Sequence, residues 1–95
     1  NAATIGKGLL NKINDFENNF PGYITNARGV GLFCAFDLPS SIERDKLISK
    51  LYKENLIILG SGDKSVRFRP HLNVTEKDID LAIEIIHLTI KNMLN

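Results

Sequence analysis

The sequence has one cysteine, almost no net charge and no long apolar run. A single cysteine, Cys34, cannot form an internal disulfide or a cysteine metal cluster, which suits a reducing, cytoplasmic setting. A net charge of +1 leaves no excess positive charge for nucleic acid or for an anionic membrane. Every apolar run is far shorter than the ~20 residues that a membrane-spanning helix needs. These absences exclude a disulfide-stapled domain and a membrane span, and they argue against a nucleic-acid partner.

The 95 residues correspond to one small domain with a modest core. An apolar fraction of 43% and a charged fraction of 24% are ordinary values for globular proteins. The first residue is Asn rather than Met, and it opens directly into a helical pattern. We therefore expect residues 1–95 to be one domain of a longer protein.

Hydrophobic spacing predicts an α+β fold. Apolar residues recur every three or four positions in three segments, whereas four shorter segments are typical of strands. The expected order is a helix over 2–17, strands over 23–29 and 31–38, a helix over 41–54, strands over 56–59 and 66–69, and a last helix that Thr75 caps. Hairpins separated by helices indicate a small, mostly antiparallel sheet of three to four strands, with helices packed on one face.

The sequence pattern also predicts three local details. Residues 31–38 are the most apolar strand, so we expect Phe33 and its neighbours to be buried on both faces or nearly so. Residues 28–31 contain two glycines and should form a tight turn or a bulge. Asp78 follows Thr75 by three positions, which predicts a shortened capping box.

Three features that look chemical have simpler explanations. Residues 60–65 (GSGDKS) contain Lys-Ser after glycines, but a phosphate-binding loop needs Gly directly before that Lys and a helix afterwards. Asp precedes Lys64 and a strand follows, so we expect a hairpin turn. Cys34 lies in an apolar strand and is expected to be a buried, inert thiol. His71 and His87 have no carboxylates at ligand spacing, so we expect no metal site.

Arg67 and Arg69 are the candidate ligand-binding residues. Lysines outnumber arginines 8 to 4, so arginines within a strand suggest a need for the planar guanidinium. Because strand side chains alternate, both arginines share one face, and Val66 and Phe68 share the other. Two interpretations remain open: a solvent-facing pair salt-bridged to nearby acids, or recognition of a carboxylate or phosphate through two parallel N–H donors.

Several motifs together resemble a known family. Residues 28–32 (RGVGL), the CAFDLP that follows and residues 62–70 (GDKSVRFRP) are similar to the C-terminal small domain of class III aminotransferases. These are pyridoxal-phosphate (PLP) enzymes of fold type I, and the likeness covers essentially all 95 residues. Within the class, RD at 44–45 and NVT at 73–75 resemble the lysine 6-aminotransferases (lysine ε-aminotransferases) most. The 4-aminobutyrate aminotransferases share a similar stretch at 62–70 and are the near alternative.

The resemblance implies a role for each arginine. Arg67 would bind a carboxylate of glutamate or 2-oxoglutarate, and an acidic residue of the large domain would take Arg67 when the amine donor is bound. Arg69 would pair structurally or support the rim of the site, and Arg28 would be scaffold. The whole enzyme, a homodimer, would move the ε-amino group of lysine to 2-oxoglutarate, giving glutamate and 2-aminoadipate 6-semialdehyde.

The resemblance also places the cofactor elsewhere. The Schiff-base lysine, the phosphate-binding residues and the pyridinium partner would all belong to the large domain, so none of the eight lysines here is assigned to PLP. Residues 1–95 alone should then fold, but neither bind PLP nor catalyse. A second class of function remains open: a stand-alone, non-catalytic module that binds a carboxylate or a protein partner.

Overall fold

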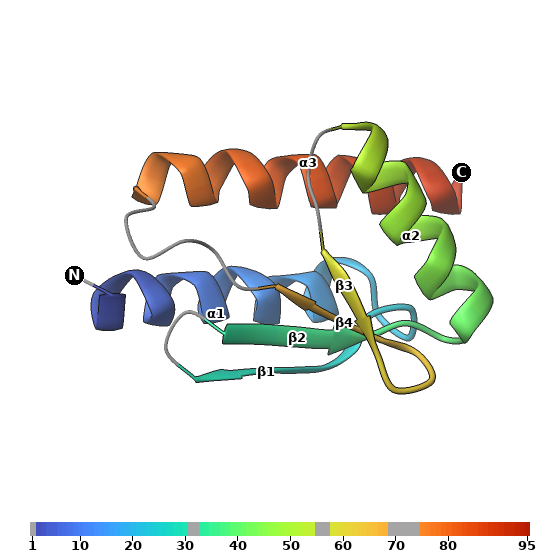
Figure 1. The fold of residues 1–95 in the computed structure, drawn as a ribbon, viewed down its shortest axis with the longest axis horizontal. Coiled ribbons are helices and arrows are strands. Elements are labelled where there is room, and N and C mark those ends of the chain that lie inside the picture. Colours follow the sequence, from blue (N-terminus) through green and yellow to red (C-terminus); the bar gives the residue numbers. More distant parts are fainter. Residues whose placement is uncertain (1, 31–32, 55–57, 69–74) are drawn as a thin grey trace.

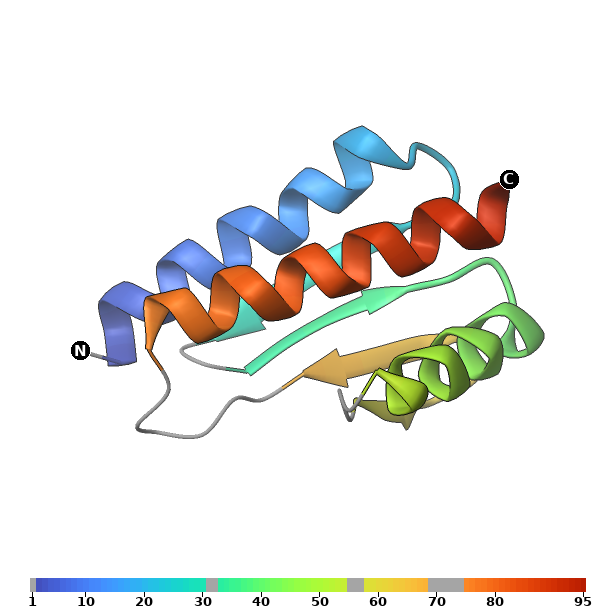
Figure 2. The same cartoon turned by 90° about the horizontal axis from the view of Figure 1, so that it is seen from above.

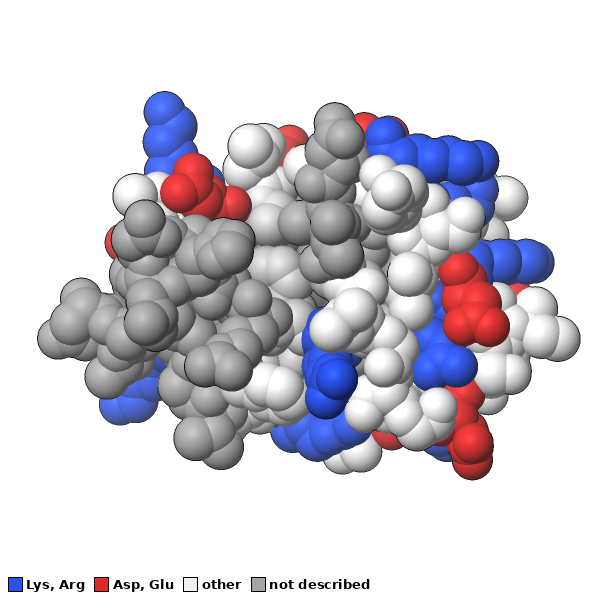
Figure 3. Space-filling view, viewed as in Figure 1, with Lys and Arg blue, Asp and Glu red and all other residues white. Residues whose placement is uncertain are grey.

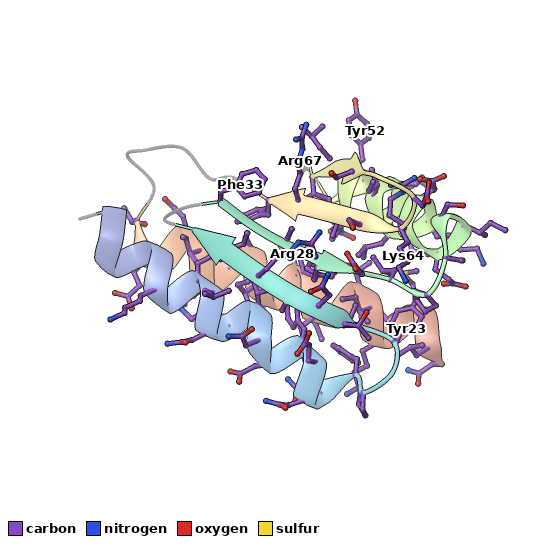
Figure 4. The ribbon with its side chains drawn as sticks, turned by 90° about the horizontal axis from the view of Figure 1, so that it is seen from below. Tyr23, Arg28, Phe33, Tyr52, Lys64 and Arg67 are labelled. Carbon is purple, nitrogen blue, oxygen red and sulfur yellow. The ribbon has the colours of Figure 1, made fainter. Side chains whose placement is uncertain are left out.

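In the computed structural model, which describes residues 2–30, 33–54, 58–68 and 75–95, three helices cover one face of a four-stranded antiparallel sheet (Figure 1). No helix of the described residues covers the opposite face, which we call the open face (Figure 4). The elements are α1 (Ala2–Asn19), β1 (Thr25–Val30), β2 (Phe33–Asp37), α2 (Ser41–Lys53), β3 (Leu59–Ser61), β4 (Ser65–Phe68) and α3 (Glu76–Leu94). This order confirms the predicted α+β fold.

The two hairpins join through their inner strands. The strand order is β1-β2-β4-β3, so β2 pairs with β4 across the middle of the sheet. In this pairing, Cys34 lies opposite Phe68, and Ala35 lies opposite Arg67. Above the sheet, α3 runs between α1 and α2 (Figure 2). The face of each hairpin that points to the helices therefore forms part of one shared apolar layer.

Apolar side chains from every layer meet in one core. Phe16 of α1 contacts Phe36 of β2 edge-to-face, with ring centroids 5.8 Å apart. Burial of each such side chain stabilises the fold by about 1.5–3 kcal/mol before entropy is counted. The largest fully buried side chains are Phe16, Phe36, Leu9, Ile13, Ile24, Leu38, Leu47, Leu51, Ile79, Ile86, Ile90 and Val66.

Side-chain caps begin α2 and α3. Ser40 is the N-cap of α2, and its hydroxyl accepts a hydrogen bond from the Glu43 amide at 3.3 Å. At α3, the Thr75 hydroxyl accepts from the Asp78 amide at 3.1 Å, and the Asp78 carboxylate accepts from the Thr75 amide at 3.2 Å. The predicted capping box is confirmed, and it fixes where α3 starts.

The prediction that β2 is buried on both faces is wrong at its first residue. Phe33 is 42% exposed because it lies on the open face of the sheet, where no helix covers it. Cys34 and Phe36 point to the helices and are buried. Leu32, which was expected in the same strand, lies outside the described residues.

The turn or bulge predicted at 28–31 is wrong for residues 28–30, and Gly31 lies outside the described residues. Arg28 to Val30 belong to β1 and pair with β2, whereas the irregularity lies between Thr25 and Arg28. There Asn26 adopts a left-handed φ of 56°. Gly29 serves a close approach instead, because a Cβ at that position would lie 2.7 Å from the Phe33 carbonyl oxygen.

The second hairpin differs slightly from its prediction. β3 runs from Leu59 to Ser61 rather than over 56–59, and residues 56–57 lie outside the described part. β4 starts at Ser65, one residue earlier than expected. Gly62 has a φ of 59° in the connection, so the hairpin turn expected here is confirmed and a phosphate-binding loop is not formed.

Loss of the α3 cap should destabilise the chain measurably. Thr75→Ala leaves an amide of the first turn without its acceptor, and we expect the free energy of unfolding to fall by about 1 kcal/mol. Thr75→Ser keeps the hydroxyl and serves as the control, with no loss expected because Ser is at least as good an N-cap as Thr. Urea unfolding of the 95-residue chain measures both, and equal losses would contradict the capping role.

Candidate functional site

Arg67 projects from β4 onto the open face of the sheet (Figure 4). Val66 and Phe68 on either side of it are buried, as the alternation predicted. Its cross-strand neighbours are Ala35 of β2 and Leu59 of β3, neither of which can accept a side-chain hydrogen bond. Within the described residues, Arg67 forms no ion pair. Arg67 is exposed on its strand, and its guanidinium has no acidic partner among the described side chains.

Of the two predicted site residues, only Arg67 can be placed. Arg69 lies outside the described residues, so its role as a rim residue stays a prediction. The interpretation of Arg67 as a solvent-facing arginine that is salt-bridged to a nearby acid finds no support among the described side chains, because the ion pairs there join other residues.

Asp37 is a buried carboxylate on the same face, and it was not among the residues predicted from the sequence. It is only 7% exposed, and one of its oxygens accepts from Arg28 Nη1 at 3.0 Å and from the Ser65 hydroxyl. The other oxygen accepts from Asn26 Nδ2 at 3.1 Å. These three donors from β1 and β4 satisfy both oxygens, so the charge is compensated where it is buried.

The pKa of Asp37 reports the balance of these effects. Burial by itself raises the pKa of this carboxyl. The hydrogen bonds from Ser65, Asn26 and Arg28, together with the charge of Arg28, outweigh burial and hold the pKa below its usual value. Asp37 therefore remains ionised at neutral pH.

Arg28 is fixed by more than the ion pair. Its Nη1 also donates to the Asn26 carbonyl at 2.7 Å, and its Nη2 donates to the Ser65 hydroxyl at 3.2 Å. The left-handed conformation of Asn26 brings both its amide and its carbonyl to this cluster. We call Asn26, Arg28, Asp37 and Ser65 the Asp37 cluster. The signal in the sequence was an acidic residue at an outward position of an otherwise apolar strand.

Cys34 and His87 lie on the helical side of the sheet. Cys34 is buried, and burial raises the pKa of its thiol to about 11. The ring of His87 lies 5.0 Å from that of Phe20, on the helical side of the molecule. No group of His, Cys, Asp and Glu in the described ranges could hold a metal ion. His71 lies outside those ranges.

The grooves of the helical layer lie away from Arg67. One of about 460 Å³ is lined by α2 and α3 residues such as Lys50 and Met93. Another of about 440 Å³ is lined by α1 and α3 residues such as Phe16 and His87. Arg67 borders neither, since it projects from the opposite face of the sheet.

Surface charge agrees with the near-neutral composition. Basic and acidic side chains are interspersed on the face in Figure 3, without a continuous basic area among the described residues. No helix in those residues is both long and apolar enough to cross a membrane. The cytoplasmic location stays a prediction.

The depressed pKa of Asp37 makes stability depend on pH. The contribution of the ionised carboxylate should be complete above the unfolded-state pKa of about 3.9, and it should be lost as pH falls through the lower folded-state value. Urea unfolding between pH 6 and pH 3 should show this loss for the natural chain and a smaller one for Asp37→Asn. The same pH dependence in both chains would contradict the compensated charge.

A family profile and two groups of enzymes match this chain in sequence. The profile of the family described as aminotransferase class-III matches residues 1–90. The L-lysine-epsilon aminotransferase of Mycobacterium tuberculosis (strain H37Rv) is 42% identical over 78 residues, which are 82% of this chain and 17% of that protein. The mitochondrial 4-aminobutyrate aminotransferase of Sus scrofa is 41% identical over 85 residues, which are 90% of this chain and 17% of that protein.

A solved structure shows the same fold. The lysine aminotransferase from M. tuberculosis superposes with a TM-score of 0.91 at 38% identity, covering 95% of this chain and 21% of that one. The chain thus spans about a fifth of the length of the relatives that it matches. With a family profile over nearly all its residues and the same fold, the chain belongs to the class III aminotransferases.

Proposed function

We propose that this chain is the C-terminal small domain of a longer, PLP-dependent L-lysine 6-transaminase, in which Arg67 binds a carboxylate of glutamate or 2-oxoglutarate. The observation that carries the proposal is an exposed guanidinium, mounted on a strand, with no acidic partner among the described residues. An arginine so placed offers two parallel donors to two carboxylate oxygens. The similarity to lysine aminotransferases over most of the chain makes lysine a candidate amine donor.

The proposed reaction explains why such an arginine is useful. The ε-amino group of lysine would pass to 2-oxoglutarate, giving 2-aminoadipate 6-semialdehyde and glutamate. One site must then bind a substrate with a cationic side chain and a dicarboxylate in turn. An arginine with no acidic partner among the described residues can bind the dicarboxylate, and an acid of the large domain can take it at other times. The whole enzyme is proposed to act as a homodimer.

The described residues of this chain do not fit PLP. A lysine that holds PLP needs an enclosed site in which its amine is desolvated. Here the lysines with described side chains lie on exposed positions of helices and of the β3–β4 turn, except Lys12, which is half-buried and paired with Asp80. The cofactor of the proposed enzyme would therefore be held by its large domain.

4-Aminobutyrate remains the alternative amine donor. The 41% identity to a 4-aminobutyrate aminotransferase is almost equal to the 42% identity to a lysine enzyme, so overall similarity does not separate them. The absorbance change of the full-length enzyme on mixing with each amine decides the question. A faster absorbance change with lysine supports lysine as the amine donor. A faster change with 4-aminobutyrate would show that 4-aminobutyrate is the donor instead.

The chain alone should bind no PLP. We expect the 95-residue chain to fold, and to lose all visible cofactor absorbance on dialysis after mixing with PLP. The physical reason is the absence of an enclosed lysine among the described residues. An absorbance band that survives dialysis would contradict the assignment of the cofactor to another domain. Saturable binding of glutarate to the chain alone would favour the stand-alone binding module.

Loss of Arg67 should impair the half-reaction with the dicarboxylate. In the full-length enzyme, Arg67→Gln removes charge-assisted hydrogen bonds that are worth about 1.5–3 kcal/mol, so the rate with 2-oxoglutarate should fall by about 10- to 100-fold. The half-reaction with lysine should change much less. Lys64→Gln is the matched control, because it removes a cation from the neighbouring turn (Figure 4). Equal effects on both half-reactions, or none, would contradict the proposed role of Arg67.

A further inference from the structure

The sheet register offers Asp37 two arginines at equivalent positions. Ala35 lies opposite Arg28 on β1 and opposite Arg67 on β4. Asp37 is two residues beyond Ala35 on the same face, so it is a diagonal neighbour of both arginines. Diagonal neighbours in antiparallel sheets lie about 7–8 Å apart, which long side chains can span. Asp37 could therefore neutralise either guanidinium.

In the structure, Asp37 pairs with Arg28 and not with Arg67. The Arg28–Asp37 ion pair is 3.0 Å long, and none joins Asp37 to Arg67. Two further contacts hold Arg28 in place, from its Nη1 to the Asn26 carbonyl and from its Nη2 to the Ser65 hydroxyl. Asn26 and Ser65 also donate to Asp37 directly. Both Asp37 oxygens thus already accept hydrogen bonds, from Arg28 and Asn26 of β1 and from Ser65 of β4.

We propose that Arg28 is a positioning residue for Arg67: it holds and neutralises Asp37, and so keeps Arg67 available for the carboxylate of the dicarboxylic substrate. This inference rests on the proposed function of Arg67. Asp37 is the acid on the open face that the register brings nearest to Arg67 within the described sheet. The Arg28–Asp37 ion pair therefore does more than stabilise the fold, because it leaves Arg67 without Asp37 as a partner.

Removal of Arg28 should change both partners of the proposed contact. Asp37 would keep two neutral hydrogen bonds but lose its cation, and Arg67 would then be the nearest guanidinium that can replace it. The uncompensated charge of Asp37 would also repel an incoming carboxylate at short range. Both effects weaken dicarboxylate binding, and neither requires Arg28 to touch the substrate.

Three variants of the full-length enzyme test the proposal. Arg28→Gln should weaken the apparent binding of 2-oxoglutarate in single-turnover experiments by about 5- to 10-fold, with a smaller effect on the lysine half-reaction. Arg28→Gln/Asp37→Asn removes the competing carboxylate and should restore binding to within about twofold of the natural enzyme. Asp37→Asn alone should bind 2-oxoglutarate at least as well as the natural enzyme.

A second pair of variants tests the same idea at a surface position. Ser61 lies opposite Ser65, and Leu59 lies opposite Arg67, so Ser61 is the diagonal neighbour of Arg67 on its other side. Ser61→Asp places there a carboxylate without its own arginine, and it should weaken 2-oxoglutarate binding as Arg28→Gln does. Ser61→Asn is the matched neutral control and should bind normally. This pair keeps the test valid if Arg28→Gln does not fold, which thermal melting reveals.

The outcomes separate this inference from the function on which it rests. Weak binding in Arg28→Gln with rescue in the double variant, together with weak binding in Ser61→Asp, supports the positioning role. Failure of the double variant to recover binding, or normal binding in Ser61→Asp, overturns it. If Arg67→Gln weakens 2-oxoglutarate binding but Arg28→Gln does not, only the positioning role fails. If Arg67→Gln itself has no effect, the proposed function fails.

Discussion

The pairing of β4 with β2 decides where the charge of Arg67 lies. Val66 and Phe68 face the helices in this register, and Arg67 faces outward beside Ala35. A slip of one residue would expose two core side chains and turn an unpaired guanidinium into the apolar layer, which would cost several kcal/mol. The hydrophobic core therefore does more than stabilise the fold, because it also fixes a cation on the open face.

The two arginines on the open face have different surroundings. Arg28 and Arg67 flank the same small residue, Ala35, yet one is held by a carboxylate and the other has no partner among the described residues. Arg28 lies beside the irregularity in β1, where the left-handed Asn26 donates to Asp37 and accepts from Arg28. This irregularity of the backbone thus supports the contact between Arg28 and Asp37, next to the surface proposed to bind substrate.

Local sequence pattern predicted the order of the helices and strands and the outward face of Arg67. The spacing of apolar residues predicted the helices, Thr75 with Asp78 predicted a cap, and alternation placed Arg67 on the outer face. It could not predict that Phe33 is exposed, because exposure depends on which face the helices leave uncovered. The Asp37 cluster was missed for a similar reason: its members come from three strands, and only the sheet order brings them together.

The central claim is that Arg67 is kept free to bind a ligand carboxylate. The most direct measurement is a structure of the full-length enzyme with glutarate bound in place of the dicarboxylic substrate. The account predicts that both donors of the Arg67 guanidinium lie about 2.7–2.9 Å from the glutarate oxygens, with Asp37 still bonded to Arg28. Glutarate bound by other residues, with Arg67 paired to Asp37, would contradict it.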